Sequence, residues 1–307
     1  MEYLVLGGNG FIGSFIVDEI ISNGHNVTVL DIGPEKFRVP LSNVKYIYGS
    51  INDLELLNET FEGKDILIHS VSTTVPYTSN QNIPFDIESN LISSVNIFRI
   101  AVQKGIKRIV YLSSGGAVYG EPITVPIPED HPTNPLSSYG ITKLAIEKYL
   151  NYFSVNNGIE YNIIRPSNPY GPRQNPFSNQ GVIAVFLGKV LRDEVIEVWG
   201  DGTIAKDYVY IKDIASAIYK SSISDKTSEA FNIGSGSFIS LNEIIETIKK
   251  VTSKDVKVSY VNSNKFDVSK VCLDINKAKK NLDFQPKVSL EQGIKETWDF
   301  IKQLNTG

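Results

Sequence analysis

Cysteine is almost missing from this sequence, and other signals are missing with it. Cys272 is the only cysteine among 307 residues, so no intrachain disulfide can form, and a cytoplasmic location is expected. It lies in a predicted strand, KVCLDI, where we expect an inert buried thiol. One cysteine and three histidines form no cluster with metal-ligand spacing, so we expect no metal.

Long apolar runs and basic stripes are missing as well. No run approaches the ~20 apolar residues that cross a membrane, and no patch of lysine and arginine suggests nucleic acid as a partner. The net charge is −4, and hydrophobic residues make up 41% of the chain. A chain of this length can bury a sizeable core. These properties agree with a soluble enzyme that binds neither membranes nor nucleic acid.

The first thirty residues have the pattern of a dinucleotide-binding unit. A short apolar strand, 2–6, ends at a glycine turn, and a helix at 11–23 leads to a second strand at 26–31. Three glycines follow the spacing G-x-x-G-x-x-G, namely Gly7, Gly10 and Gly13. They allow a tight turn, the approach of a pyrophosphate to the backbone, and close packing of helix on strand.

This unit also favours NAD over NADP. The N–H groups at the start of the helix, at Phe11 and Ile12, would hold the phosphates. Asp31 ends the second strand, eighteen residues after Gly13. A carboxylate there accepts hydrogen bonds from ribose hydroxyls and repels a 2′-phosphate. We therefore predict NAD as the cofactor.

Strands and helices alternate through the first two-thirds of the chain. This alternation, with apolar β-branched strands, predicts a parallel sheet covered on both faces, with ligands at the carboxyl ends of its strands. The predicted strands are 2–6, 26–31, 44–48, 65–69, 107–113 and 160–165, and the predicted helices are 11–23, 53–61, 85–104, 137–157 and 180–191.

The pattern loosens after about residue 165. Short strands are predicted there between helices at 212–223, 240–251 and 289–304, and no linker separates this part from the rest. We predict an α/β fold, a Rossmann-like doubly wound parallel sheet with a smaller, interleaved α/β substrate-binding lobe. The NAD-binding domain would span 1–165, and 166–307 would form most of the lobe, with some segments returning to the first domain.

Tyr139 and Lys143 are four residues apart in a predicted helix, which places them on one face. A nearby ammonium favours phenolate, so the pKa of Tyr139 is expected to fall from ~10 toward working pH. A base poised near neutrality suits proton removal from a hydroxyl. Taken alone, this spacing is also common by chance. The glycine turn and Asp31 make the catalytic interpretation the stronger one.

Several further motifs stand in a recognisable order. They are GGNGFIG at 7–13, Asn90 in the long helix, SSGGAVYG at 113–120, YGITK at 139–143, RPSNPYGPRQ at 165–174, GDGTIAKDYVYIKDIA at 200–215 and FNIGSG at 231–236. With these motifs the chain resembles the extended short-chain dehydrogenase/reductases, and among them the NAD-dependent nucleotide-sugar epimerases typified by UDP-galactose 4-epimerase.

The resemblance implies inversion at C4 of a UDP-hexose through a transient 4-keto sugar and tightly bound NAD. Tyr139 would take and return the proton of the 4-hydroxyl, and Lys143 would hold the nicotinamide ribose. One alternative is an NAD(H)-dependent reductase of a keto nucleotide sugar, which would consume added cofactor. Another is a non-catalytic NAD sensor, against which the proton-transfer tyrosine argues. The sugar itself is not predicted.

The stretch at 113–120 narrows the chemistry. Similar dehydratases and decarboxylases have acidic residues where this chain has Gly115, Gly116 and Ala117, so those reactions are disfavoured. The family's catalytic serine would fall on Gly115. Ser113, Ser114 or neither takes its place, and we favour Ser114.

The resemblance also implies further binding residues and a homodimer. The helices at 85–104 and 137–157 of two subunits would form a four-helix interface. Positions matching the family's cofactor contacts are Ser50, Ile51, Ser70, Asn90 and Ser113. Those matching its contacts with the nucleotide sugar are Ser114, Asn168, Arg173, Lys206, Tyr208 and Asp267. A surface role is the alternative for these polar residues except Asn168, which lies in the best-matched motif, and Ser114, for which a turn at the strand end is the alternative.

Overall fold

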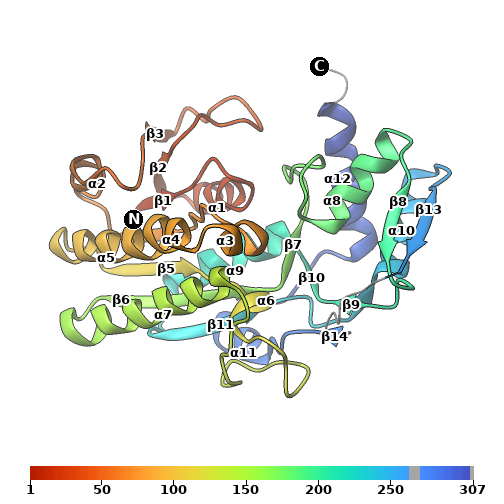
Figure 1. The fold of residues 1–307 in the computed structure, drawn as a ribbon. Coiled ribbons are helices and arrows are strands. Elements are labelled where there is room, and N and C mark those ends of the chain that lie inside the picture. Colours follow the sequence, from red (N-terminus) through yellow and green to blue (C-terminus); the bar gives the residue numbers. More distant parts are fainter. Residues whose placement is uncertain (263–269, 305–307) are drawn as a thin grey trace.

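A seven-stranded parallel sheet forms the centre of the protein, in a computed structural model that describes residues 1–262 and 270–304 (Figure 1). Its strand order is β3-β2-β1-β4-β5-β6-β11. The strands are β1 (Glu2–Leu6), β2 (Asn26–Asp31), β3 (Val44–Tyr48), β4 (Ile66–His69), β5 (Arg108–Leu112), β6 (Glu160–Pro166) and β11 (Glu229–Ile233). The predicted fold class is confirmed.

Helices cover both faces of this sheet, because its strands are apolar on both sides. On one face, α1 (Phe11–Ser22) packs on α9 (Ile211–Ile223). On the other, α2 (Leu54–Thr60) and α5 (Ser93–Gln103) pack beside α7 (Ser138–Asn157). Two buried clusters of aliphatic and aromatic side chains lie between sheet and helices, one on each face.

The register of the sheet brings distant segments to one edge. Leu6 of β1 pairs with Leu30 of β2 on one side and with His69 of β4 on the other. Strand order reverses between β2 and β4 around β1, which opens a crevice at the carboxyl ends of these strands. The segments that follow β1, β4 and β5 therefore meet at this crevice.

The lobe consists of small sheets and three helices, α8 (Val182–Leu191), α10 (Leu241–Thr252) and α12 (Leu290–Leu304). Its strands pair as β7–β10, β8–β13 and β12–β9–β14. They are β7 (Asn168–Tyr170), β8 (Ile196–Trp199), β9 (Ala205–Lys206), β10 (Tyr208–Tyr210), β12 (Ile239–Ser240), β13 (Val258–Val261) and β14 (Lys270–Val271). Two elements from beyond residue 166, α9 and β11, lie against or within the main sheet.

One predicted helix differs from the structure. The segment at 85–104 was expected as a single helix, but it is divided into α4 (Ile83–Asp86), a π-helix η1 (Ile87–Ile92) and α5. The amide of Asn90, inside η1, donates to the carbonyl and the carboxylate of Asp86 and accepts from the N–H of Thr73. These bonds favour the wider turn, which sequence periodicity does not reveal. Short helices α3 (Pro76–Gln81), α6 (Gly115–Val118) and α11 (Asn276–Leu282) complete the chain.

Candidate active site

The glycine turn after β1 has the shape needed for a dinucleotide. Gly7 has φ +80°, and a Cβ on Gly13 would lie 2.0 Å from the carbonyl oxygen of Gly7. Only glycine lets α1 start this close to the strand. No side chain caps the first turn of α1, whose N-cap is Gly10. The N–H groups of this turn, including those of Phe11 and Ile12, therefore fit a pyrophosphate.

Asp31 and Ser70 flank this turn. The carboxylate of Asp31 accepts from the N–H of Asn9 at 3.0 Å, so it is held beside the glycine loop. The hydroxyl of Ser70 donates to the carbonyl of Leu6 at 2.7 Å. Ile51 is buried, and Ser50 accepts from the N–H of Asn52 at 3.1 Å in the loop after β3. These predicted cofactor residues lie at or just after the carboxyl ends of β1, β2, β3 and β4, an arrangement that fits NAD.

The start of α7 places Tyr139. Ser137 caps the helix by accepting from the N–H of Gly140, and Ser79 of α3 accepts from the N–H of Tyr139 at 3.0 Å. The side chain of Tyr139 lines a cavity of about 390 Å³ and forms a hydrogen bond with that of Ser114. Asn168, Lys206 and Tyr208 line the same cavity. The structure therefore brings together five residues that sequence reasoning placed in the active site.

The expected fall in the pKa of Tyr139 is wrong for the protein alone. Burial, with a smaller effect of the Asp86 carboxylate, raises the pKa of Tyr139 to about 12 against the opposing effect of the hydrogen bond with Ser114. Lys143 lies 5.6 Å from the centre of the Tyr139 ring and donates to the carbonyl of Leu112 at 2.9 Å. Burial lowers the pKa of Lys143 to about 8. The ammonium of Lys143 faces the backbone of β5, so its charge offsets little of the free-energy cost of burying a phenolate at Tyr139.

Ser113, Ser114 and Gly115, which stands where the family serine would fall, have different surroundings. The hydroxyl of Ser113 donates to Glu147 at 2.5 Å and is buried away from the cavity. A Cβ on Gly115 would lie 2.6 Å from a methyl group of Leu273, so position 115 has no room for a serine side chain. Ser114 contacts Tyr139 and lines the cavity. This arrangement favours Ser114.

One predicted binding residue, Arg173, does not line this cavity. The guanidinium of Arg173 pairs with Asp18 of α1 at 2.8 Å and stacks 4.2 Å above the ring of Phe15. Its neighbour Gln174 lines the cavity in its place, and nothing in the sequence distinguished the two. Asp267 lies outside the described residues.

Asn168 is held by the backbone of Asp207, whose own side chain is buried. Its amide donates to the carbonyl of Asp207 at 2.7 Å. The side chain of Asp207 is buried and accepts from the N–H and hydroxyl of Ser235, both at 2.7 Å, and from the N–H of Leu273 at 3.3 Å. The sulfur of Cys272 lies 3.8 Å from the same carboxylate, and Cys272 is a buried free thiol, as expected.

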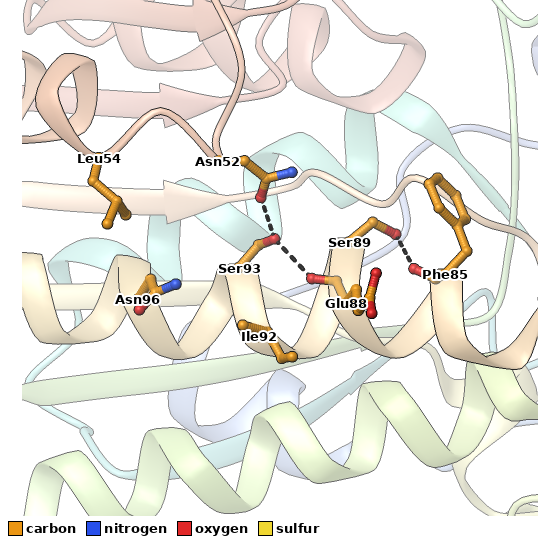
Figure 2. A pocket seen from close by; sticks show the side chains of 8 residues that line it. All are labelled: Asn52, Leu54, Phe85, Glu88, Ser89, Ile92, Ser93 and Asn96. Carbon is orange, nitrogen blue, oxygen red and sulfur yellow. Dashed lines mark hydrogen bonds between the residues drawn. The ribbon is translucent and has the colours of Figure 1, made fainter.

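A second cavity lies on the outer side of α4, η1 and α5 (Figure 2). It has a volume of about 440 Å³ and contains none of the predicted site residues. Ser93 donates to the amide oxygen of Asn52 there at 2.5 Å, which fastens α5 to the loop after β3. Apolar Leu54, Phe85 and Ile92 border this cavity and are exposed.

A metal site and a membrane-spanning helix were both expected to be absent. No group of three or more histidine, cysteine, aspartate or glutamate residues within 1–262 and 270–304 could hold a metal ion. None of the helices in these ranges has the length and apolarity to span a membrane.

Known proteins resemble this chain over almost its full length. The NAD dependent epimerase/dehydratase family matches residues 3–234. A crystallised UDP-glucose 4-epimerase of Thermotoga maritima, with UDP-glucose, superposes with a TM-score of 0.94 at 36% identity, covering 99% of this chain and all of that one. A UDP-glucose 4-epimerase of Mycolicibacterium smegmatis is 31% identical over 98% of this chain and 99% of its own length. A dTDP-4-dehydro-6-deoxyglucose reductase of Escherichia coli is also 31% identical, over 95% and 94%.

Proposed function

This chain belongs to the NAD-dependent epimerase/dehydratase family, and from that premise we propose that it is a 4-epimerase of a UDP-hexose. The observation that carries the proposal is the lining of the cavity around Tyr139. Ser114, Gly116 and Ala117 lie there, and no aspartate or glutamate is among the described residues that line it. Loss of water needs an acid and a base in addition to the tyrosine, and similar decarboxylating enzymes also have a glutamate at this place, whereas inversion only returns the proton that Tyr139 takes.

The proposed reaction assigns a proton to Tyr139. Bound NAD supplies the acceptor and later the donor of hydride at C4. Tyr139 takes the proton of the 4-hydroxyl, with Ser114 hydrogen-bonded to both oxygens, and returns it when the 4-keto sugar has turned over. Lys143 holds the nicotinamide ribose. Because burial raises the pKa of Tyr139, the hydrogen bond with Ser114 and, once the cofactor is bound, the positive charge of its oxidised form would together favour phenolate.

The nucleotide sugar is assigned to the lobe side of the cavity. Lys206 is the only charged side chain among the described residues lining it, and we assign it to the diphosphate. Asn168 and Tyr208 lie beside it. Arg173 would have to leave Asp18 to reach the same phosphates.

Mixing purified protein with UDP-glucose, UDP-N-acetylglucosamine and UDP-glucuronate tests the proposal. An epimerase converts one of them to its C4 epimer without net change at 340 nm, because it recycles its own NAD. The similarity to a reductase supports the second candidate, a keto-sugar reductase, which would consume added NADH when it is given a 4-keto nucleotide sugar. Steady consumption of NADH with a 4-keto nucleotide sugar, and no epimer formed from the other three, would replace the first proposal by the second.

Tyr139→Phe is expected to lower turnover by at least about 10²-fold, the usual contribution of a general acid–base group. Bound NAD, measured after acid release, should be unchanged. Tyr149→Phe removes a hydroxyl from an exposed position of the same helix and is the matched control. Wild-type activity in Tyr139→Phe would contradict the mechanism.

We also propose that the protein is a cytoplasmic homodimer. The helices α4, η1 and α5 pack beside α7, and their outer sides form one surface (Figure 1). Apolar side chains are exposed on it, with exposed fractions of 51% for Ile92, 57% for Ile141 and 45% for Tyr149. Apolar patches of this kind often mark an interface between subunits.

A further inference from the structure

Two buried carboxylates lie at opposite ends of the Tyr139–Lys143 pair. Asp86 of α4 is fully buried and faces the start of α7. It accepts from the hydroxyls of Ser138 and Thr142, both at 2.7 Å, and from the hydroxyl of Thr74. Ser138 and Thr142 each precede one member of the pair, so Asp86 holds the stretch of helix that carries it.

The second carboxylate belongs to Glu147, one helical turn after Lys143. Residues 139, 143 and 147 share one face of α7. Glu147 is buried and forms a two-pronged pair with Arg165 of β6, at 3.0 Å to Nε and 2.6 Å to Nη2. Ser113, at the end of β5, donates to the same carboxylate at 2.5 Å. Glu147 thus joins α7 to the ends of two strands.

Lys143 lies between these carboxylates in an otherwise apolar setting. On α7 it faces Tyr139 and Glu147, on β5 it lies 5.0 Å from the centre of the Tyr111 ring, and on β4 the neutral His69 is near. Asp86 contributes from α4, and Arg165 of β6 reaches the region through Glu147. The two carboxylates are the groups that oppose the loss of the lysine's proton on burial.

We propose that Asp86 and Glu147 are positioning residues that keep Lys143 charged and fixed beneath the cofactor. An ammonium donates stronger hydrogen bonds to ribose oxygens than a neutral amine does, and only the ammonium attracts a developing phenolate by its charge. The roles of the two carboxylates differ. Asp86 also raises the pKa of Tyr139, by less than burial does, whereas Glu147 lies at the far end of the pair. The link to turnover rests on the proposed epimerase function, but the charge of Lys143 does not.

The test measures the ionisation of Lys143 directly in the full-length protein. The ¹³Cε resonance of Lys143 is assigned by its loss in Lys143→Met, and its titration midpoint is compared between wild type and Asp86→Asn. In Asp86→Asn the amide oxygen can still accept from the hydroxyls of Ser138 and Thr142, which share one oxygen of Asp86. We expect the midpoint to fall by about one pH unit, as for removal of a nearby opposite charge. Glu88→Gln is the control, because Glu88 is an exposed carboxylate beside the outer cavity, two residues from Asp86 (Figure 2).

The pH profile of turnover supplies the second measurement. The alkaline limb of kcat in Asp86→Asn should move to lower pH, since Lys143 loses its proton earlier. A merely structural role would lower kcat at every pH and leave the limb in place. Glu147→Gln should also lower the midpoint. Because it leaves the buried Arg165 without its charged partner, Glu147→Gln/Arg165→Gln is measured beside it.

An unchanged Lys143 midpoint in Asp86→Asn would overturn the inference. If the midpoint falls but the wild type epimerises no UDP sugar, the proposed function fails and the inference stands. If the wild type epimerises a UDP sugar and the Lys143 midpoint does not move in Asp86→Asn, the inference fails and the proposed function stands.

Discussion

His69 illustrates how burial sets the ionisation of a single residue beneath the crevice. Its ring is buried at the end of β4, with Nε2 2.9 Å from the hydroxyl of Ser94 and its centre 5.4 Å from that of Tyr111. Burial, with a smaller effect of Lys143, lowers the pKa of His69 to about 3. The folded protein therefore keeps this imidazole neutral, while the unfolded chain protonates it near its ordinary pKa of 6.5.

This difference predicts a loss of stability in acid. Between about pH 6.5 and 3 the unfolded state binds one proton more at His69, so the free energy of unfolding falls as pH falls, by a few kcal/mol in all. His69→Gln should show a shallower decline in urea titrations across this range. His25→Gln, at a partly exposed position where burial lowers the imidazole pKa less than at His69, should change the slope less than His69→Gln does. Equal slopes in His69→Gln and wild type would contradict the prediction.

At the scale of elements, the glycine turn makes a sharper demand than its sequence pattern suggests. A Cβ on Gly13 would lie 2.0 Å from the Gly7 oxygen and 2.9 Å from the Cα of Gly8, so backbone must move to admit it. A Cβ on Gly33, in the loop after β2, would meet nothing within 4 Å.

Gly13→Ala is therefore expected to destabilise the fold by about 1–3 kcal/mol, the usual cost of an overpacked site. It should also weaken NAD retention, because the shift displaces the N–H groups at the start of α1. Urea midpoints and cofactor released by acid measure the two effects. Gly33→Ala should match the wild type in both. Normal NAD content in Gly13→Ala would show that the turn tolerates displacement.

The elements also show what sequence patterns can and cannot predict. The strands at 2–6, 26–31 and 44–48 match β1, β2 and β3, because continuous apolar runs between turn residues leave little freedom. The helix at 85–104 was wrong in its interior, because its π-turn follows from bonds of Asn90 to Asp86 and Thr73. Such bonds depend on tertiary neighbours, which leave no periodic trace.

The candidate site residues also fall into two groups, those that spacing in the sequence predicts and those that depend on tertiary contacts. Tyr139, Lys143 and the glycines could be predicted, because their chemistry depends on spacing within one turn or helix. Asp86 and Glu147, which we propose as positioning residues, were not predicted, since their partners lie 52 and 18 residues away, at Ser138 and Arg165. The hydroxyl of Ser113, which was assigned to the cofactor, donates to Glu147 in this structure.

At the scale of the whole molecule, a charge introduced on the exposed side of α7 tests the proposed dimer. Ile141→Glu places a charge at a position that is 57% exposed in the single chain and would be covered in the dimer. Size-exclusion chromatography with light scattering at micromolar protein should find wild type at twice the chain mass and this variant at the chain mass. Ile123→Glu, 75% exposed in the loop before α7, should stay dimeric. A monomeric wild type would end the proposal.

The buried thiol beside Asp207 makes the protein convenient for chemical labelling. Burial, together with the neighbouring carboxylates of Asp207 and Asp274, raises the pKa of Cys272 to about 12, so almost none of it is thiolate at neutral pH. Because Cys272 is the only cysteine, a thiol introduced on the surface would be the sole reactive one, and the native residue need not be replaced. A fluorophore or spin label could then report on the crevice in an otherwise unaltered enzyme.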